Sequence, residues 1–165
     1  MNIISWNIRG AKGLPKKQAM KSMIQDEKPS IILHQETKCS QESIMTIVKK
    51  IWRDSNCIEI DSQGHVGGMA IVWDNNRVIL NNIQATRNYI SASFHIIGSH
   101  MEETICNVYA PQTTTLKLNF LHNLKCLLEH IHKPLIIGGD FNIITTLLEK
   151  KVGIRRLDQE GQSLK

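Results

Sequence analysis

Four apolar segments of this 165-residue sequence end in polar side chains that could carry out chemistry. The polar residues at these segment ends are Asn7, Glu36, Tyr109, and Asp140 with Asn142. A carboxylate and an amide oxygen suit Mg²⁺, a hard cation that prefers oxygen ligands. A second carboxylate can orient or deprotonate water, and an amide and a phenol can donate hydrogen bonds to a phosphoryl oxygen. The residue types therefore favour metal-assisted chemistry on a phosphate ester.

Each of these residues also has an ordinary structural explanation. Asp140 and Asn142 fit an Asx turn or the cap of a following helix. Glu36 fits a solvated charge, Asn7 fits a turn, and Tyr109 fits a packed ring at a strand end. For Asp140 with Asn142, and for Glu36, the ordinary explanation is the better one when the residue is taken singly, and Tyr109 fits both explanations equally well. All of them together favour a site, because the ends of strands in a rigid sheet can aim several groups at one point.

The segments that must position these residues alternate between strand-like and helix-like patterns. Apolar residues at helical spacing predict helices at 15–29, 42–52 and 116–131. Short runs rich in Ile, Leu and Val predict strands, and those between 57 and 109 are typical of antiparallel strands joined by hairpins. The pattern predicts an α/β fold in which a two-layer β-sandwich is flanked by helices, giving four layers, α-β-β-α. The expected strands are 3–7, 30–34, 69–73, 78–80, 90–97, 104–109 and 134–139.

Composition limits the possible classes of protein. Hydrophobic residues make up 41% and charged residues 21%, which is typical of a globular domain and argues against disorder. The net charge of +5 suits a polyanionic partner without proving one. No apolar stretch approaches the roughly 20 residues that span a bilayer, so we expect no membrane partner. The four cysteines form no close pair, which argues against a zinc knuckle or a redox motif and favours a reduced, intracellular compartment.

Five short motifs resemble those of the endonuclease/exonuclease/phosphatase superfamily, which includes pancreatic deoxyribonuclease and the abasic-site exonucleases. In chain order they are Ser-Trp-Asn-Ile-Arg-Gly at 5–10, Gln-Glu-Thr-Lys at 35–38, Gly-Gly-Met-Ala-Ile-Val-Trp at 67–73, Asn-Val-Tyr-Ala-Pro at 107–111 and Gly-Gly-Asp-Phe-Asn at 138–142. The third motif, with Glu-Lys-Lys at 149–151, is most similar to the endonuclease of plant non-LTR (LINE-type) retrotransposons.

The resemblance implies a deoxyribonuclease-like fold and a role for each candidate residue. Glu36 would be the main Mg²⁺ ligand, with Asn7 beside it, and Mn²⁺ could substitute. Asp140 would align and activate the attacking water, and Asn142 would contact the scissile phosphate and help to hold Asp140. Tyr109 would hydrogen-bond the phosphate in the transition state. The product would be a nicked strand that carries a 3′-hydroxyl.

The resemblance also implies partners and a location. The partner would be DNA, with a reverse transcriptase domain in cis in the parent element, and no obligate protein partner is evident. A functional retroelement endonuclease would work in the nucleus. Three basic residues near the expected site, Arg9, Lys12 and Lys38, are candidates for steering DNA, although a solvated surface is the safer explanation for any one of them.

One departure from the superfamily pattern separates three functional hypotheses. The superfamily ends in a Ser-Asp-His motif, whereas this sequence has Asp158 but no histidine after Asn142. We therefore expect 1–165 to be a single, C-terminally incomplete domain that lacks the last strands. The first hypothesis is a Mg²⁺-dependent DNA endonuclease impaired by that loss. The second is an inactive retroelement remnant that binds nucleic acid weakly, and the third is a phosphoesterase acting on a small or lipid phosphate ester.

Overall fold

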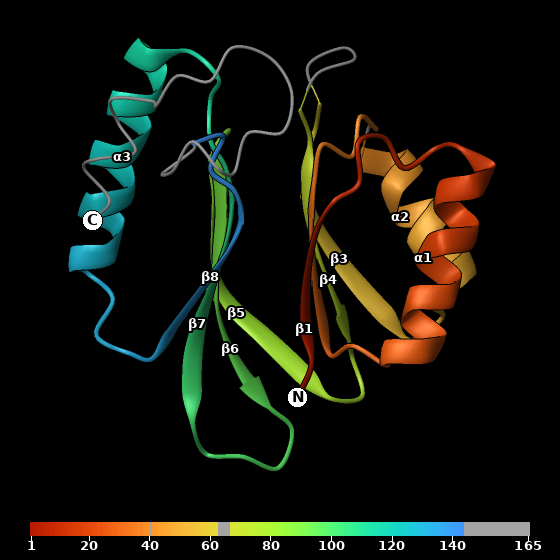
Figure 1. Ribbon diagram of the computed structural model, residues 1–165. Coiled ribbons are helices and arrows are strands. Elements are labelled where there is room, and N and C mark those ends of the chain that lie inside the picture. Colours follow the sequence, from red (N-terminus) through yellow and green to blue (C-terminus); the bar gives the residue numbers. More distant parts are fainter. Residues whose placement is uncertain (40, 63–66, 144–165) are drawn as a thin grey trace.

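The computed structural model describes residues 1–39, 41–62 and 67–143, which form two sheets packed face to face with helices on the outside (Figure 1). The helices are α1 (Leu14–Glu27), α2 (Gln41–Ile51) and α3 (Thr114–Glu129). The strands are β1 (Ile3–Asn7), β2 (Ile31–Gln35), β3 (Ser55–Ile60), β4 (Met69–Asp74), β5 (Val78–Ala85), β6 (Tyr89–Ile96), β7 (Glu102–Tyr109) and β8 (Leu135–Asp140).

The first sheet has the strand order β1-β2-β4-β3, with β1 parallel to β2 and the other pairs antiparallel. Helices α1 and α2 cover its outer face (Figure 1). Helix α1 has Pro15 in its first turn, where a missing N–H costs nothing, and ends at Lys28, which takes a left-handed conformation before Pro29. Met20 packs with Ile32, Ile44 and Val72 in the apolar layer between these helices and the sheet.

The second sheet has the order β5-β6-β7-β8, in which β7 and β8 are parallel. Helix α3 covers β7 and β8, and its Phe120 and Leu124 pack with Cys106 and Val108. A third apolar layer, which includes Leu33 and other buried residues, lies between the two sheets. In each sheet a helix links two parallel strands, so β1 and β2, and likewise β7 and β8, direct their C-terminal ends to the same end of the sandwich (Figure 1).

The predicted fold class is confirmed, and two details differ from the expectations. Strand β3 was not predicted, because Cys57 and Glu59 alternate with Ile58 and Ile60, and the face that carries Cys57 and Glu59 lacks a clear apolar pattern. The chain between β4 and β5 is not a hairpin, because it passes from the first sheet to the second. The expectations for the Glu-Lys-Lys motif at 149–151 and for an incomplete C-terminus lie outside the described residues.

The cysteines pack as the sequence predicted for residues beside apolar runs. Cys39, Cys57 and Cys106 are buried, and Cys126 is exposed. Burial raises the pKa of Cys57 and of Cys106 to about 12, so both remain protonated thiols at neutral pH. No helix in the described ranges is long and apolar enough to span a membrane.

Candidate active site

The predicted residues meet at the end of the sandwich where the parallel strands end. Asn7 closes β1, Glu36 follows β2 directly, Tyr109 closes β7 and Asp140 closes β8. The strand registers make Asn7 the neighbour of Gln35 in one sheet and Tyr109 the neighbour of Asp140 in the other. Each sheet therefore contributes a pair of adjacent strand ends to one location.

A single amide group connects the two sheets at this location. The Nδ2 atom of Asn7 donates to Glu36 Oε1 at 3.0 Å and to Asp140 Oδ2 at 2.7 Å. The Oδ1 atom of Asn7 is buried and has no hydrogen-bond partner among the described residues. Two carboxylates thus converge on one donor, and the only oxygen that the Asn7 side chain carries is buried without a partner among the described residues.

The loop that carries Glu36 is held by backbone hydrogen bonds on both sides. Thr37 and Lys38 donate their N–H groups to the carbonyls of Gly68 and Gly67, each at 3.1 Å, and the Glu36 carbonyl accepts from Gly10 at 2.7 Å. Glu36 itself is left-handed, with φ of 53°. For a non-glycine residue this conformation costs about 1 kcal/mol or more, and such strain is concentrated at functional sites.

The side chain of Glu36 is mostly enclosed, with 17% of its surface exposed. Its Oε2 atom lies 3.6 Å from Lys38 Nζ, in a half-exposed ion pair. From the sequence alone, Glu36 could have been a solvated charge on the surface. The structure instead places this carboxylate in contact with Asn7 and Lys38.

Asp140 forms the Asx turn that the sequence suggested, and its carboxylate also contacts Asn7 in the cluster. Its Oδ1 accepts the Asn142 N–H at 2.9 Å, which is an Asx turn, while its Oδ2 binds Asn7. The Asn142 Nδ2 atom donates to the Ala110 carbonyl at 2.6 Å, and the Ala110 N–H donates to the Asp140 carbonyl at 2.8 Å. The turn therefore fixes the carboxylate that faces the first sheet.

The phenol of Tyr109 lies beside the two carboxylates. Burial raises the pKa of Tyr109 above its ordinary value, and the negative charges of Glu36 and Asp140 raise it further. The phenol is therefore protonated at neutral pH and is able to donate a hydrogen bond. Asn88 holds the Tyr109 backbone, accepting its N–H at 2.9 Å and donating Nδ2 to its carbonyl at 3.0 Å.

The three basic residues predicted to steer DNA occupy loops on the first-sheet side of this location. Arg9 and Lys12 are exposed in the segment between β1 and α1. Lys38 is half-exposed and, through its contact with Glu36, is part of the cluster itself. The geometry brings Lys38 together with the candidate site and leaves Arg9 and Lys12 on the surface.

A cavity adjoins the cluster on the Tyr109 side. Its volume is about 530 Å³, and it is bounded by both glycines of the 67–68 pair, by the segment after β7 and by the turn between β5 and β6. Arg87 contributes the positive charge of its lining. The residues that line it are Ile60, Asp61, Gly67, Gly68, Arg87, Asn88, Tyr109, Ala110, Pro111 and Gln112.

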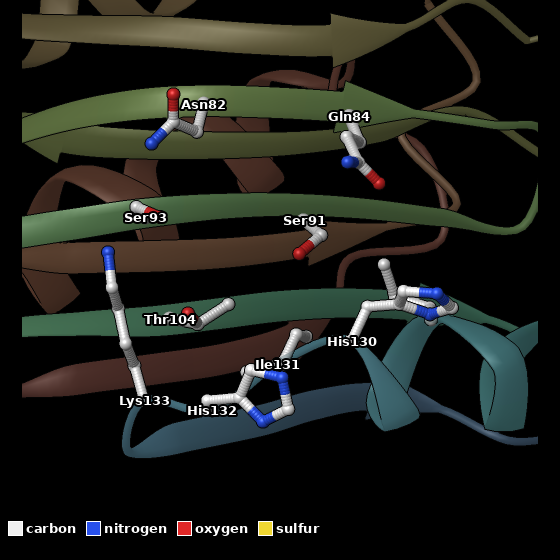
Figure 2. Close-up of a pocket in the computed structure, with 10 residues that line it drawn as sticks. Asn82, Gln84, Ser91, Ser93, Thr104, His130, Ile131, His132 and Lys133 are labelled. Carbon is white, nitrogen blue, oxygen red and sulfur yellow. The ribbon is translucent and has the colours of Figure 1, made fainter.

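A second cavity, of about 250 Å³, lies on the outer face of the second sheet and has no contact with the cluster (Figure 2). Figure 2 shows Ser91, Ser93 and Thr104 on the strands, facing residues that follow α3. Two of its basic groups already have partners, because Lys133 pairs with Glu102 and the His130 Nδ1 lies 2.7 Å from the Cys126 carbonyl.

Sequence reasoning missed the polar residues beneath the cluster. Gln35 and Asn107 are buried between the sheets, and Gln35 also reaches Ser5. Their signal was present in the sequence, because an amide inside an otherwise apolar strand must find a partner when it is buried.

The donor set fits a hard divalent cation. Glu36 supplies a carboxylate oxygen, and the buried, unpartnered Oδ1 of Asn7 is a neutral oxygen of the kind that such cations accept. The Asp140 carboxylate binds the same Asn7 amide and adds negative charge beside this pair. In the described residues no group of three or more His, Cys, Asp or Glu side chains could hold a metal.

Comparison with known proteins gives a consistent result. The sequence pattern of the Endonuclease/Exonuclease/phosphatase family matches residues 4–157. Members of this family typically use a divalent metal. A DNA-(apurinic or apyrimidinic site) endonuclease of Dictyostelium discoideum is 26% identical over 161 residues, which cover 92% of this chain and 44% of that protein. The chain thus spans less than half the length of this relative.

Solved structures share the fold at low sequence identity. TDP2 of D. rerio, complexed with a single-strand DNA product, superposes with a TM-score of 0.68 at 18% identity, covering 86% of this chain and 60% of that one. The mannosyl-6-phosphatase Bt3783 of Bacteroides thetaiotaomicron superposes with a TM-score of 0.67 at 15% identity, covering 86% and 65%. On the extent of the sequence match, this chain belongs to the Endonuclease/Exonuclease/phosphatase family.

Proposed function

We propose that this chain carries the catalytic cluster of a Mg²⁺-dependent phosphodiester hydrolase that acts on DNA. The observation that carries the proposal is the bridge from Asn7 to Glu36 and Asp140, which gathers two carboxylates and an unpartnered amide oxygen at one point. Likeness to an endonuclease that acts on abasic sites supports the same reaction class.

The proposed roles follow from the contacts of each residue. Glu36 and the Asn7 oxygen would hold the cation, which when bound neutralises negative charge on the phosphate. Asp140 is held by its turn and would orient and deprotonate the attacking water. The protonated phenol of Tyr109 would donate a hydrogen bond to a phosphate oxygen. Asn142 would support Asp140 through its N–H and contact the phosphate.

We further propose that the element of origin was a non-LTR retrotransposon. The support is the motif similarity noted at 67–73, and the parent polyprotein would then add a reverse transcriptase. In that case DNA would be recognised partly by charge. Arg9 and Lys12 project from the first-sheet side, beside the ion pair of Lys38 with Glu36.

The first test is nicking of supercoiled plasmid by the purified chain, in Mg²⁺ and in EDTA. Glu36→Gln removes a charge at the centre of the cluster, and Glu129→Gln is a matched control on exposed α3, paired only with Lys125 among the described residues. We expect nicking in Mg²⁺ alone and at least a hundredfold loss in Glu36→Gln, because a metal-binding carboxylate supplies several kcal/mol. Equal rates in the two variants would refute the assignment of Glu36.

The same preparation separates the two other hypotheses. A folded chain that binds plasmid but does not nick it would indicate an inactive remnant. Hydrolysis of p-nitrophenyl phosphate, with none of bis(p-nitrophenyl) phosphate, would indicate a monoesterase, the class to which the structurally similar mannosyl-6-phosphatase belongs by name.

Charge-based binding predicts a dependence on salt. Each phosphate contact made by a lysine or arginine releases counterions, so the affinity for duplex DNA should fall as salt rises. Changing Arg9 and Lys12 together to Gln should reduce the slope of log affinity against log salt by about 1 to 2. A fluorescence anisotropy titration at several salt concentrations measures this slope, and an unchanged slope would exclude these two residues from the interface.

A further inference from the structure

Two buried amide side chains face each other between the sheets, directly beneath the cluster. Gln35 is 1% exposed and Asn107 is fully buried. The Gln35 Nε2 atom donates to Asn107 Oδ1 at 2.7 Å. The Asn107 Nδ2 atom donates to the carbonyls of His34 and Ala70, both at 3.0 Å. A side chain of the second sheet therefore binds the backbone of two adjacent strands of the first.

The rest of the space between the sheets is apolar. Leu33, Ile71, Phe94 and Ile105 are among the residues that fill it. Apolar side chains would bury the same surface without directional constraints, and a buried amide is unfavourable unless it is fully paired. Both NH₂ groups of the Gln35–Asn107 pair and the Asn107 oxygen have partners, and these directional bonds favour one separation and one register of the two sheets.

The residues that precede the cluster form one continuous layer. Ser5 lies two residues before Asn7, and its Oγ accepts from Gln35 Nε2 at 3.3 Å. Gly138 lies two residues before Asp140, and a Cβ on it would stand 2.8 Å from Leu33 Cδ1. Gln35 is the residue directly before Glu36, and Asn107 lies two residues before Tyr109. The residues that precede the cluster on its four strands are therefore each polar or very small, and they contact one another between the sheets.

We propose that Gln35 and Asn107 are positioning residues that set the distance between the two sheets, and so between the Asn7–Glu36 side and the Tyr109–Asp140 side of the cluster. Their effect on cleavage rests on the function proposed above. Their effect on geometry does not, because the bridge from Asn7 to both carboxylates is made by protein atoms alone.

The test uses the side-chain amide of Asn7 as a reporter in ¹⁵N–¹H spectra of the full metal-free chain, with its signals identified by their loss in Asn7→Ser. Gln35→Met and Asn107→Ala remove the pair, whereas Ile105→Ala removes an apolar side chain from the same face of β7. We expect both pair variants to move the Asn7 signals toward those of a solvated amide, while Ile105→Ala leaves them in place. The exchanged pair Gln35→Asn with Asn107→Gln should restore part of the shift.

A titration with Mg²⁺ on the same samples separates this inference from the proposed function. We expect Mg²⁺ affinity about tenfold or more weaker in Gln35→Met than in Ile105→Ala, because residues outside the ligand set that orient it typically contribute that much to affinity. Asn7 signals that stay unchanged in both pair variants, or move equally in Ile105→Ala, would overturn the positioning role. A wild-type chain that does not respond to Mg²⁺ would overturn the proposed function, and the metal-free spectra would still decide this inference.

Discussion

Glu36 and Asp140 bind the same Asn7 amide, but the strands that carry them are held differently. Strand β2 lies between β1 and β4 and is buried along its whole length. In the part of the chain that the structure describes, β8 pairs with β7 alone, and it is half-buried throughout. The position of Glu36 is thus determined by its own sheet, whereas that of Asp140 depends on a short glycine segment and on contacts across the sandwich.

The largest loss of stability should come from a substitution in the glycine pair of β8, Gly138 and Gly139. Gly139 has φ of +145°, and a Cβ there would lie 2.0 Å from the Val108 carbonyl oxygen, so the backbone itself would have to move. We expect Gly139→Ala to lower the free energy of unfolding by about 4 kcal/mol, at the upper end for single substitutions. Urea unfolding monitored by tryptophan fluorescence measures the loss.

Gly98→Ala provides the matched control for backbone strain. Gly98 also has positive φ, at +88°, but a Cβ there meets nothing within 4 Å. It should therefore cost only the conformational term, about 1 to 2 kcal/mol. Similar losses in the two variants would mean that the contact with Val108 does not hold β8, and that the contrast between the two strand ends is smaller than we infer.

The sequence predicted this end of the molecule better than it predicted what supports it. Short apolar runs followed by Asn7, Glu36, Tyr109 and Asp140 were sufficient to place four strand ends, because burial of a strand and exposure of its end both follow from local pattern. The contact of Asn7 with Asp140 joins residues 133 positions apart, and no local pattern specifies it.

The supporting layer was not predicted for the same reason. Gln35 and Asn107 each look like a polar interruption of an apolar run, and only the packing of one sheet on the other makes them partners. Glu59 is similar, since it is a half-buried carboxyl on the same face of β3 as the buried Cys57, where an apolar residue is expected. Burial, with a smaller contribution from the charge of Asp61, raises the pKa of Glu59 to about 8.

The complete burial of β2 carries a cost that depends on pH. His34 is buried, and both ring nitrogens lack a hydrogen-bond partner within the described residues. Burial lowers the pKa of His34 from 6.5 to about 4, an effect that the Trp6 backbone partly offsets. The unfolded chain therefore binds a proton between pH 6.5 and 4 that the folded chain does not bind, and stability falls as the pH falls through this range.

His34→Leu should remove this dependence. Relative to the variant, the wild-type chain should lose about 3 kcal/mol between pH 7 and pH 4, from a shift of about 2.5 pKa units. Urea unfolding of both chains at several pH values gives the difference. A constant difference across this range would show that His34 titrates normally, and that the interior of β2 is more accessible to water than its burial indicates.

The smallest effect should come from the glycine pair that supports Glu36. A Cβ on Gly68, where φ is +85°, would lie 2.3 Å from Thr37 Oγ1 and 3.4 Å from the backbone nitrogen of Lys38. The closest atom belongs to a side chain, so Gly68→Ala should cost only about 2 kcal/mol, less than Gly139→Ala.

Because Thr37 adjoins Glu36, we also expect weaker Mg²⁺ binding by calorimetry. Removing the hydroxyl in Gly68→Ala with Thr37→Ala should recover part of both losses, since the two residues are in contact. If the two substitutions are additive, the clash is not what displaces the loop, and the left-handed backbone of Gly68 alone accounts for the cost.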